Sequence, residues 1–443
     1  MKKIGVAPLE PERGSAKRLH KSVYIRSLLA AVFILIFAAC SDSSLFPSQQ
    51  TAEGAPGRFD YALSVGISTD SSRAEIERRY GGHVVVWRPE AGFAVLGLQD
   101  TGTLHTLSAG ENKDAFKVPE FAASATYGNG RSSWAGGRSS WAGGRSSWAG
   151  GEPTTFVENL GYWDQVDLPE AQALAPRLGA GVKVAVIDTG IDLVHPAFAG
   201  KLAPADEWKD FVDGDAYPQE EAGAIYGHGT GVADLILQVA PNVTLLPIRA
   251  LGPDGLGDTV DVIAAIDYAV QRGADIINLS LGTDTEEKVL KDLIKYAHKQ
   301  EVLIVASVGN SGEENIMFPA RYGKDGKEVL SVGSVNFDDE LSSFSSYGKE
   351  LTLTAPGESL YTASPEQSVA FWSGTSFSTP LVSGAAALAL GEGHPKVKPK
   401  DIGKKLADAS DDVSRVRRNN SYKGDQLGKG RLDIEDFLED VFK

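Results

Sequence analysis

The sequence predicts an α/β fold in which helices cover both faces of a parallel sheet, preceded by a small α+β domain. The first observation is that short, apolar, β-branched runs alternate with helical patterns from about residue 152 to the end of the chain. Strands buried on both faces have this composition, and the helices between them return the chain in the same direction. The second is a separate group of strand-like runs at 57–120. We therefore expect a large domain at 152–443 and a small one at 57–120.

Each element of both domains follows from such a pattern. The strands expected in the large domain are residues 182–187, 243–248, 275–280, 303–307 and 329–334. The helices expected there are residues 258–272, 286–299, 376–390 and 399–409. In the small domain, strands are expected at 59–67, 83–87 and 92–98. Its helix should begin after Ser72, where the sequence SRAE is a capping box, and run through Tyr80.

Composition excludes some classes of function. The chain has 443 residues and a formal net charge of -16, so it lacks the basic surplus that neutralises phosphates, and we expect no nucleic-acid partner. Its only cysteine is Cys40, which rules out an intramolecular disulfide.

The N-terminus has the features of an export signal. A basic segment precedes an apolar run at 28–39, which is short for a membrane span and matches a signal-peptide core at 1–39. The run ends FAAC and resembles the lipobox of bacterial lipoproteins, with Phe37 in place of the usual aliphatic residue. We expect lipidation of Cys40, a tether at 40–56, and a location in the bacterial cell envelope or, after release, outside the cell. Plain secretion is the alternative.

Residues 121–151 form a linker with three RSSWAGG repeats. The Gly and Ser pairs in every unit defeat a helix, so a flexible linker is the favoured interpretation. The alternative is that the Trp and Arg side chains of the repeats dock on a partner, because exposed Trp and Arg are typical binding anchors.

Three residues of the types that form a nucleophilic triad occupy positions suited to chemistry. Asp188 directly follows the apolar run 184–187, so it is expected at the carboxyl end of a parallel strand, where the active sites of open sheets lie. His228 stands in the sequence GHGTG at the start of an apolar helix. Ser376 begins another helix, where the field of the helix N-terminus favours developing negative charge.

The segments around these residues resemble the three signature blocks of the subtilase family of serine proteases. They read VAVIDTG at Asp188, HGT at His228 and GTS at Ser376, and the resemblance extends over about residues 160–435. It implies a subtilisin-like fold and a serine endopeptidase that hydrolyses peptide bonds through an acyl-enzyme. By this resemblance Ser376 attacks the scissile carbonyl, His228 transfers the proton and Asp188 orients the imidazole.

The same resemblance implies an oxyanion donor and two substrate-binding segments. Asn310, in the sequence VGNSG, matches the side chain that donates to the oxyanion. The substrate is expected to bind as an added strand between two segments. These are Gly255, Leu256 and Gly257 on one side and Ser280, Leu281 and Gly282 on the other. Ile316 and Met317 stand near where small residues often line the primary pocket, so we expect a restricted pocket.

An acidic loop is the candidate metal site. The segment 210–219 resembles a calcium-binding loop of subtilases, and its hard oxygen ligands suit calcium. The candidate ligands are Asp210, Asp213, Asp215 and Gln219. A solvated acidic turn is the alternative, and no cofactor is expected to be required for the chemistry.

Residues 57–120 resemble the propeptides of subtilases, which assist folding and cover the active site until they are cleaved. We expect autocleavage between about residues 119 and 155, which would leave the lipid anchor on the propeptide. The expected partners are polypeptide substrates, the chain's own propeptide and, through Cys40, a membrane, and the enzyme is expected to be a monomer. The competing hypotheses are a tethered scaffold that binds through the Trp repeats, for which a damaged triad would be expected, and a protease with a narrow processing role.

Overall fold

The computed structural model describes residues 59, 61–99, 115–117, 120–123, 156–323, 326–394 and 397–443. All of them lie in one compact unit, Gly54–Lys443. The expected signal peptide at 1–39, Cys40, the tether at 40–56 and the Trp repeats lie outside the described residues. Among the described helices, none has the length and apolar character needed to cross a membrane.

The small N-terminal domain has the strands and the helix that the sequence predicts, and one further strand. Its elements are β1 (Tyr61–Gly66), α2 (Arg73–Tyr80), β2 (His83–Arg88), β3 (Phe93–Leu98) and β4 (Ala115–Lys117). The strands pair in the order β2-β3-β1-β4, and Leu63, Leu96 and Tyr80 form part of the core beneath them. Ser72 is the N-cap residue of α2, but its side chain makes no capping hydrogen bond, so the predicted capping box is wrong.

The large domain is built on a seven-stranded sheet in the order β14-β13-β12-β10-β6-β8-β7. Every pairing in it is parallel. Its strands are β6 (Lys183–Asp188), β7 (Lys209–Asp210), β8 (Thr244–Arg249), β10 (Ile276–Leu279), β12 (Leu303–Ser307), β13 (Val329–Val335) and β14 (Leu353–Pro356). The α/β fold class predicted from the sequence is confirmed.

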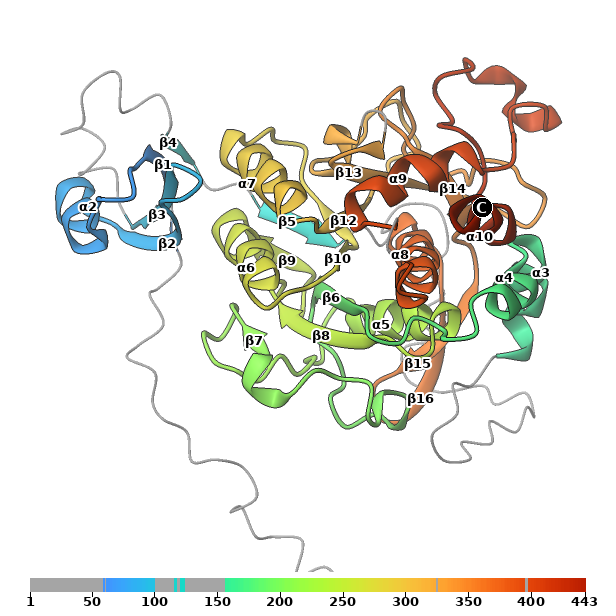
Figure 1. Ribbon diagram of the computed structural model, residues 1–443, viewed down its shortest axis with the longest axis horizontal. Helices are drawn as coiled ribbons and strands as arrows, with labels where there is room; N and C mark the ends of the chain where they lie inside the picture. The colour runs from blue at the N-terminus through green and yellow to red at the C-terminus, as the bar shows by residue number, and fades with distance from the viewer. Residues whose placement is uncertain are drawn as a thin grey trace, which may run out of the picture. The chain divides into compact units, whose positions relative to one another are not determined.

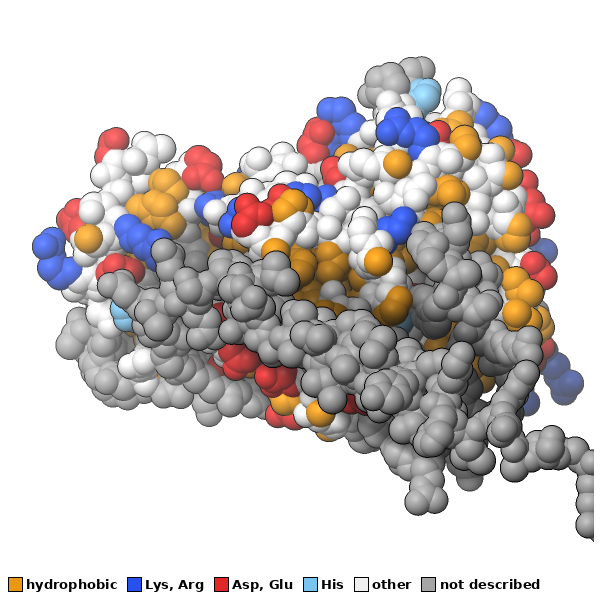
Figure 2. All heavy atoms as spheres, turned by 90° about the horizontal axis from the view of Figure 1, so that it is seen from below, with side chains coloured by type: hydrophobic (Ala, Val, Ile, Leu, Met, Phe, Trp, Pro, Cys, Tyr) orange, Lys and Arg blue, Asp and Glu red, His pale blue; other side chains and the backbone are white. Residues whose placement is uncertain are grey.

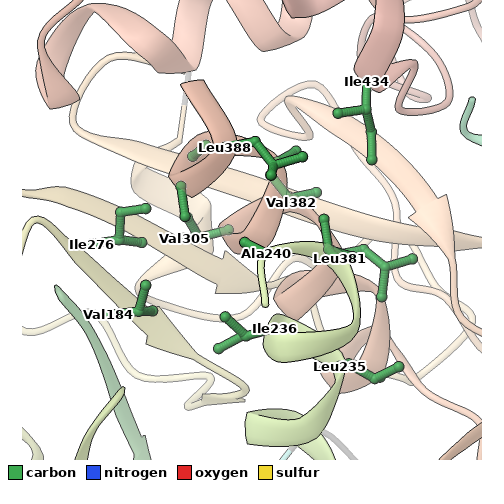
Figure 3. Packing of buried hydrophobic residues seen from close by; sticks show 14 of the residues in the cluster. Val184, Leu235, Ile236, Ala240, Ile276, Val305, Leu381, Val382, Leu388 and Ile434 are labelled. Carbon is green, nitrogen blue, oxygen red and sulfur yellow. The ribbon is translucent and has the colours of Figure 1, made fainter. Parts of the chain in front are cut away.

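Helices lie on both faces of this sheet (Figure 1). The long ones are α5 (His228–Val239), α6 (Thr259–Gln271), α7 (Lys288–Lys299), α8 (Thr375–Gly391), α9 (Pro399–Asp408) and α10 (Ile434–Phe442). Alternate residues of β6 face opposite sides: Val184 and Val186 belong to the core with α5 and α8, whereas Ala185 and Ile187 belong to the core with α6 and α7. Figure 3 shows part of the first core, to which Val184 of β6, Ile236 of α5 and Leu381 of α8 all belong. This two-sided burial explains why the strands are continuously apolar.

Several short elements carry weaker sequence signals. They are α3 (Leu160–Gln165), α4 (Leu168–Leu174), β5 (Glu120–Ala123), β9 (Leu256–Asp258), β11 (Leu281–Gly282) and the hairpin of β15 (Leu360–Ser364) and β16 (Ser368–Trp372). Short 3-10 helices lie at Val157–Asn159, Pro196–Phe198, Ala205–Glu207, Ala320–Tyr322 and Arg417–Ser421. On the face shown in Figure 2, the Lys and Arg side chains of the described residues lie scattered among acidic and apolar ones.

Candidate active site

Asp188 and His228 form a buried hydrogen-bonded pair at the carboxyl edge of the sheet. Asp188 is the last residue of β6, and its Oδ1 lies 2.7 Å from Nδ1 of His228, the first residue of α5. The Asp188 Oδ1 also accepts the N–H of Thr189 at 2.8 Å. This arrangement makes Nδ1 the protonated nitrogen and leaves Nε2 as the basic one.

Glycines allow the two elements that carry this pair to approach each other. A Cβ on Gly229 would lie 2.0 Å from the carbonyl oxygen of Gly190, so no larger residue fits beside His228. Gly227 has φ 99°, the left-handed conformation that suits glycine, and it turns the chain into α5. The imidazole packs edge-on against Trp372 and Phe377, with ring centroids 6.0 and 5.2 Å away.

Ser376 lies in the first turn of α8 and is fully buried. Its hydroxyl donates to the carbonyl of Ser280 at 3.1 Å, and the backbone carbonyl of Ser376 accepts the hydroxyl of Ser280 at 2.7 Å. Among the described residues, neither Nε2 of His228 nor Oδ2 of Asp188 has a hydrogen-bond partner. A rotation about the Cα–Cβ bond of Ser376 would redirect its hydroxyl away from the Ser280 carbonyl.

Asn310, the candidate oxyanion donor, lies beside the start of α8. Its Oδ1 accepts the backbone N–H of Thr375 at 2.9 Å and the Thr375 hydroxyl at 3.1 Å. These two bonds fix the amide through its oxygen, which leaves the amide nitrogen as the donor end of the side chain. Together with the N-terminus of α8, it can stabilise negative charge on a carbonyl oxygen attacked by Ser376.

The two predicted substrate-binding segments flank a strand of the same chain. β5 pairs antiparallel with β9, where Phe121 lies opposite Gly257, and with β11, where Ala123 lies opposite Leu281. The N–H of Ala123 also donates to the carbonyl of Gly255 at 2.9 Å. β5 therefore occupies the place in which a peptide would add as a strand.

The four candidate calcium ligands are engaged by protein donors. Arg249 at the end of β8 is buried, and its Nη1 lies 2.9 Å from Oδ2 of Asp210 and 2.6 Å from Oδ2 of Asp213. Asp215 Oδ1 accepts the N–H of Tyr217, and Gln219 Oε1 accepts that of Leu193. Burial raises the pKa of Asp210, although Arg249 and two backbone N–H groups act in the opposite direction.

This arrangement does not fit a calcium ion, because an internal guanidinium already takes the carboxylates that the ion would need. Over the described ranges, no three His, Cys, Asp or Glu residues are grouped to hold a metal. Calcium at this loop stays a prediction from the sequence, and Arg249 competes for the same ligands.

Sequence reasoning missed Arg249 and the buried carboxylate of Glu220. Arg249 directly follows an apolar run, and a charge in that position was a usable signal. Glu220 accepts hydrogen bonds from Thr189, Gly229 and Thr230, and burial raises its pKa. The sequence around Glu220, residues 219–224, contains Gly, Ala and another acidic residue, so nothing in it indicates that Glu220 is buried.

Comparison with known proteins gives consistent matches. The model of the subtilase family (Peptidase_S8) matches residues 179–426. A thermophilic serine proteinase of Bacillus sp. (strain AK1) is 36% identical over 239 residues, which are 52% of this chain and 57% of that protein. The major intracellular serine protease of Bacillus subtilis (strain 168) is 37% identical over 256 residues, 53% of this chain and 78% of that protein. Thermitase of Thermoactinomyces vulgaris is 35% identical over 240 residues, 52% of this chain and 81% of that protein.

The matched region contains the geometry described above. Asp188, His228 and Ser376 all lie within residues 179–426, as do Asn310 and both substrate-binding segments. The family match covers more than half of the chain, and the fold and the buried Asp–His pair agree with it. The chain therefore belongs to the subtilase family and is a serine-type endopeptidase.

Proposed function

We propose that this chain is the exported precursor of an endopeptidase, whose N-terminal domain occupies the substrate cleft until the enzyme cuts the connection. The observation that carries the proposal is β5, which follows that domain and lies as a strand between β9 and β11. Further contacts hold the small domain on the enzyme: Arg88 pairs with Asp267 of α6 at 2.7 Å, and Tyr296 of α7 donates to Glu90. A domain that occupies the substrate cleft in this way would keep a protease of broad sequence tolerance inactive during export.

The register of β5 indicates where the connection is cut. Ala122 lies opposite Gly282 and Ala123 opposite Leu281. Leu281, the partner of Ala123, directly follows Ser280, whose carbonyl accepts the Ser376 hydroxyl, so the described end of β5 lies close to Ser376. We propose that the scissile bond is the one between Ser124 and Ala125, just after β5 and inside the interval 119–155 expected from the sequence.

The proposed reaction uses side chains of the chain itself. Ser376 Oγ forms a bond to the peptide carbonyl carbon while Nε2 of His228 takes the hydroxyl proton, and the oxyanion is held by Asn310 and the N-terminus of α8. His228 returns the proton to the leaving amine as the C–N bond breaks. A water molecule then attacks the acyl-enzyme while His228 takes its proton. His228 returns this proton to Ser376 Oγ as the ester bond breaks. Asp188 keeps the imidazole in the tautomer that this sequence needs.

We propose that the residue before the scissile bond is small, because Met317 fills space beside the substrate strand. A Cβ on Gly282 would lie 2.9 Å from Cβ of Met317, and one on Gly309 would lie 2.7 Å from its Sδ. Met317 thus lies between β11 and the residue that precedes Asn310. The chain's own sequence at 122–125, Ala-Ala-Ser-Ala, meets this restriction. In a peptide library, Ala, Ser and Gly should be favoured, and Met317→Gly should admit Phe or Tyr.

Export and tethering are supported by the N-terminal sequence alone. The signal peptide at 1–39 precedes Cys40, and the proposed cut at 124 leaves any lipid on the propeptide side. Metabolic labelling with a palmitate analogue should mark the propeptide fragment and should fail in Cys40→Ser. Labelling that persists in Cys40→Ser would contradict a lipid at this residue.

The central experiment expresses the full chain in wild-type and Ser376→Ala form. The wild-type protein should degrade casein and yield a mature N-terminus at Ala125, while Ser376→Ala should stay at precursor length and be inactive. Casein hydrolysis that survives Ser376→Ala would contradict the proposed triad. Cleavage of Ser376→Ala at the same bond and rate would show that another protease performs the processing.

A further inference from the structure

Glu220 is a buried carboxylate close to the catalytic pair, with no part in the reaction described so far. Only 3% of the residue is exposed. Its Oε1 accepts the Thr189 hydroxyl at 2.6 Å and the N–H of Gly229 at 3.2 Å. Its Oε2 accepts the N–H of Thr230 at 3.1 Å and also the Thr230 hydroxyl. Four donors thus converge on one side chain.

All of these donors belong to residues one or two positions after a proposed triad member. Thr189 follows Asp188, and its N–H donates to Asp188 Oδ1 at 2.8 Å. Gly229 and Thr230 follow His228 and form the first turn of α5. The Thr189 hydroxyl also accepts the N–H of Gly229 at 3.0 Å. Glu220 therefore joins the end of β6 to the start of α5 on both sides of the Asp188–His228 bond.

Stability alone is a poor reason for this arrangement. A carboxylate removed from water is costly unless a cation or several donors compensate, and the hydrogen-bond partners of Glu220 in the described structure are neutral groups. By contrast, the other strong acidic cluster nearby is paired with Arg249. A carboxylate without a paired cation offers directional acceptors, which can fix the distance between two backbone segments.

We propose that Glu220 is a positioning residue: it holds Thr189 and the first turn of α5 so that Asp188 and His228 keep their hydrogen-bonded geometry. It acts through these neighbours, and the hydrogen bonds of its side chain in the described structure all go to Thr189, Gly229 and Thr230. The inference rests on the proposed triad. Its signature is a loss of kcat with little change in KM, because substrate binding by β9 and β11 is left intact.

The primary test compares Glu220→Gln with Asp234→Asn in the mature enzyme. Gln has nearly the same size as Glu. In the wild type both carboxylate oxygens accept hydrogen bonds, so the NH2 group of Gln would face hydrogen-bond donors and could not accept from them. Asp234 is the matched control, since it is a buried carboxylate later on α5 whose Oδ2 accepts Gln238 and Ala363. Active sites are counted by labelling Ser376 to completion with a fluorophosphonate, so that kcat refers to folded enzyme only.

We expect Glu220→Gln to lower kcat per labelled site by about 100-fold, the size of effect that a small misplacement of catalytic groups produces, with KM close to wild type. Asp234→Asn should keep the wild-type kcat per site. Equal kcat per site in Glu220→Gln and wild type would overturn the proposal. A failure of the triad itself would appear differently, as activity remaining in Ser376→Ala.

A second pair of variants covers the case in which Glu220→Gln does not fold. Thr189→Val removes the hydroxyl that links Glu220, Gly229 and Asp188, while Thr189→Ser retains it. The Val variant should lose kcat per site and the Ser variant should recover it. Equal kcat in the two variants would contradict the positioning role.

Discussion

The ends of two adjacent strands carry side chains of opposite charge, and the two side chains have different kinds of partner. Asp188 ends β6 and Arg249 ends β8, and the two residues are direct partners in the parallel register. Both are buried. Arg249 pairs its two terminal nitrogens with three carboxylates, those of Asp210, Asp213 and Glu221. At both strand ends some polar atoms have no hydrogen-bond partner among the described residues: Nε of Arg249, Oδ2 of Asp188 and Nε2 of His228. The difference lies in the charges, because three carboxylates surround the guanidinium, whereas Asp188 is paired with a single imidazole.

This difference separates a structural ion cluster from the pair that we propose to be catalytic. A buried charge that only stabilises the fold is expected to be neutralised by opposite charges, because a buried charge left unpaired is costly. A catalytic base must leave its basic atom without a hydrogen-bond partner, so that this atom can take a proton. The free energy that this costs is offset by stabilising contacts elsewhere in the fold. The contrast leads to four predictions, ordered by the free energy at stake.

Arg249→Met should produce the largest loss of stability. It leaves Asp210 buried without its cation, and breaking such a pair costs about 3 to 5 kcal/mol. Urea unfolding of the full chain in the Ser376→Ala background would measure it without self-digestion. Adding Asp210→Asn should recover part of the loss, since the unpaired carboxylates that remain, Asp213 and Glu221, are exposed to solvent. If Arg249→Met folds as stably as its parent but loses kcat, the division between the two strand ends is wrong.

Asn310→Ala should act on the reaction and leave stability nearly unchanged. Removing an oxyanion donor lowers kcat by about 100- to 1000-fold, a magnitude measured on subtilisin, which belongs to this same family. Thr375→Val is the control, because it removes one of the two bonds that orient the Asn310 amide and keeps the donor. Its kcat should fall by much less. Similar losses in both variants would indicate that Asn310 acts by holding Thr375.

Asp234→Asn should change how stability depends on pH. Burial raises the pKa of Asp234 from 3.8 to about 6, so the folded state binds this proton more tightly than the unfolded state. Its stabilising contribution is present below pH 4 and is lost as the pH rises through 6. Relative to Asp234→Asn, the parent should therefore lose on the order of 2 to 3 kcal/mol between pH 4 and 7. Parallel unfolding curves for the two proteins across that range would contradict the raised pKa.

The sequence predicted those parts of the fold that follow from local pattern. The five strands at the centre of the sheet and helices α6 to α9 were found within a few residues, because burial on two faces leaves a continuous apolar signal and helical faces leave a periodic one. β7 and β11 have two residues each. Strands this short are defined by pairing with a neighbouring strand, so no local sequence pattern predicts them. Strand β5 is of the same kind, since its place between β9 and β11 depends on contacts distant in sequence.

The sequence predicts a triad at Asp188, His228 and Ser376, and the structure places Asp188 at the end of β6 and His228 at the start of α5, as the local patterns predict. The orientation of the Ser376 hydroxyl toward Ser280 could not be predicted, because it depends on a rotamer within a packed site. Glu220 and Arg249 were missed for a related reason. Their roles come from partners that lie between 9 and 39 residues away along the chain, and no spacing rule connects such residues.

Removal of divalent cations should have the smallest effect, and it tests the loop at 210–219 directly. Because Arg249 already neutralises Asp210 and Asp213, excess chelator should change the free energy of unfolding of the Ser376→Ala chain by less than about 1 kcal/mol. A structural ion at 100 times its Kd would instead contribute about 2.7 kcal/mol, a loss visible as a fall of several degrees in Tm. Such a fall, reversed by calcium and absent in Asp215→Asn, would restore the calcium site predicted from the sequence. It would also show that Arg249 and a metal ion share these carboxylates, so that the strand end opposite Asp188 is a mixed charge cluster.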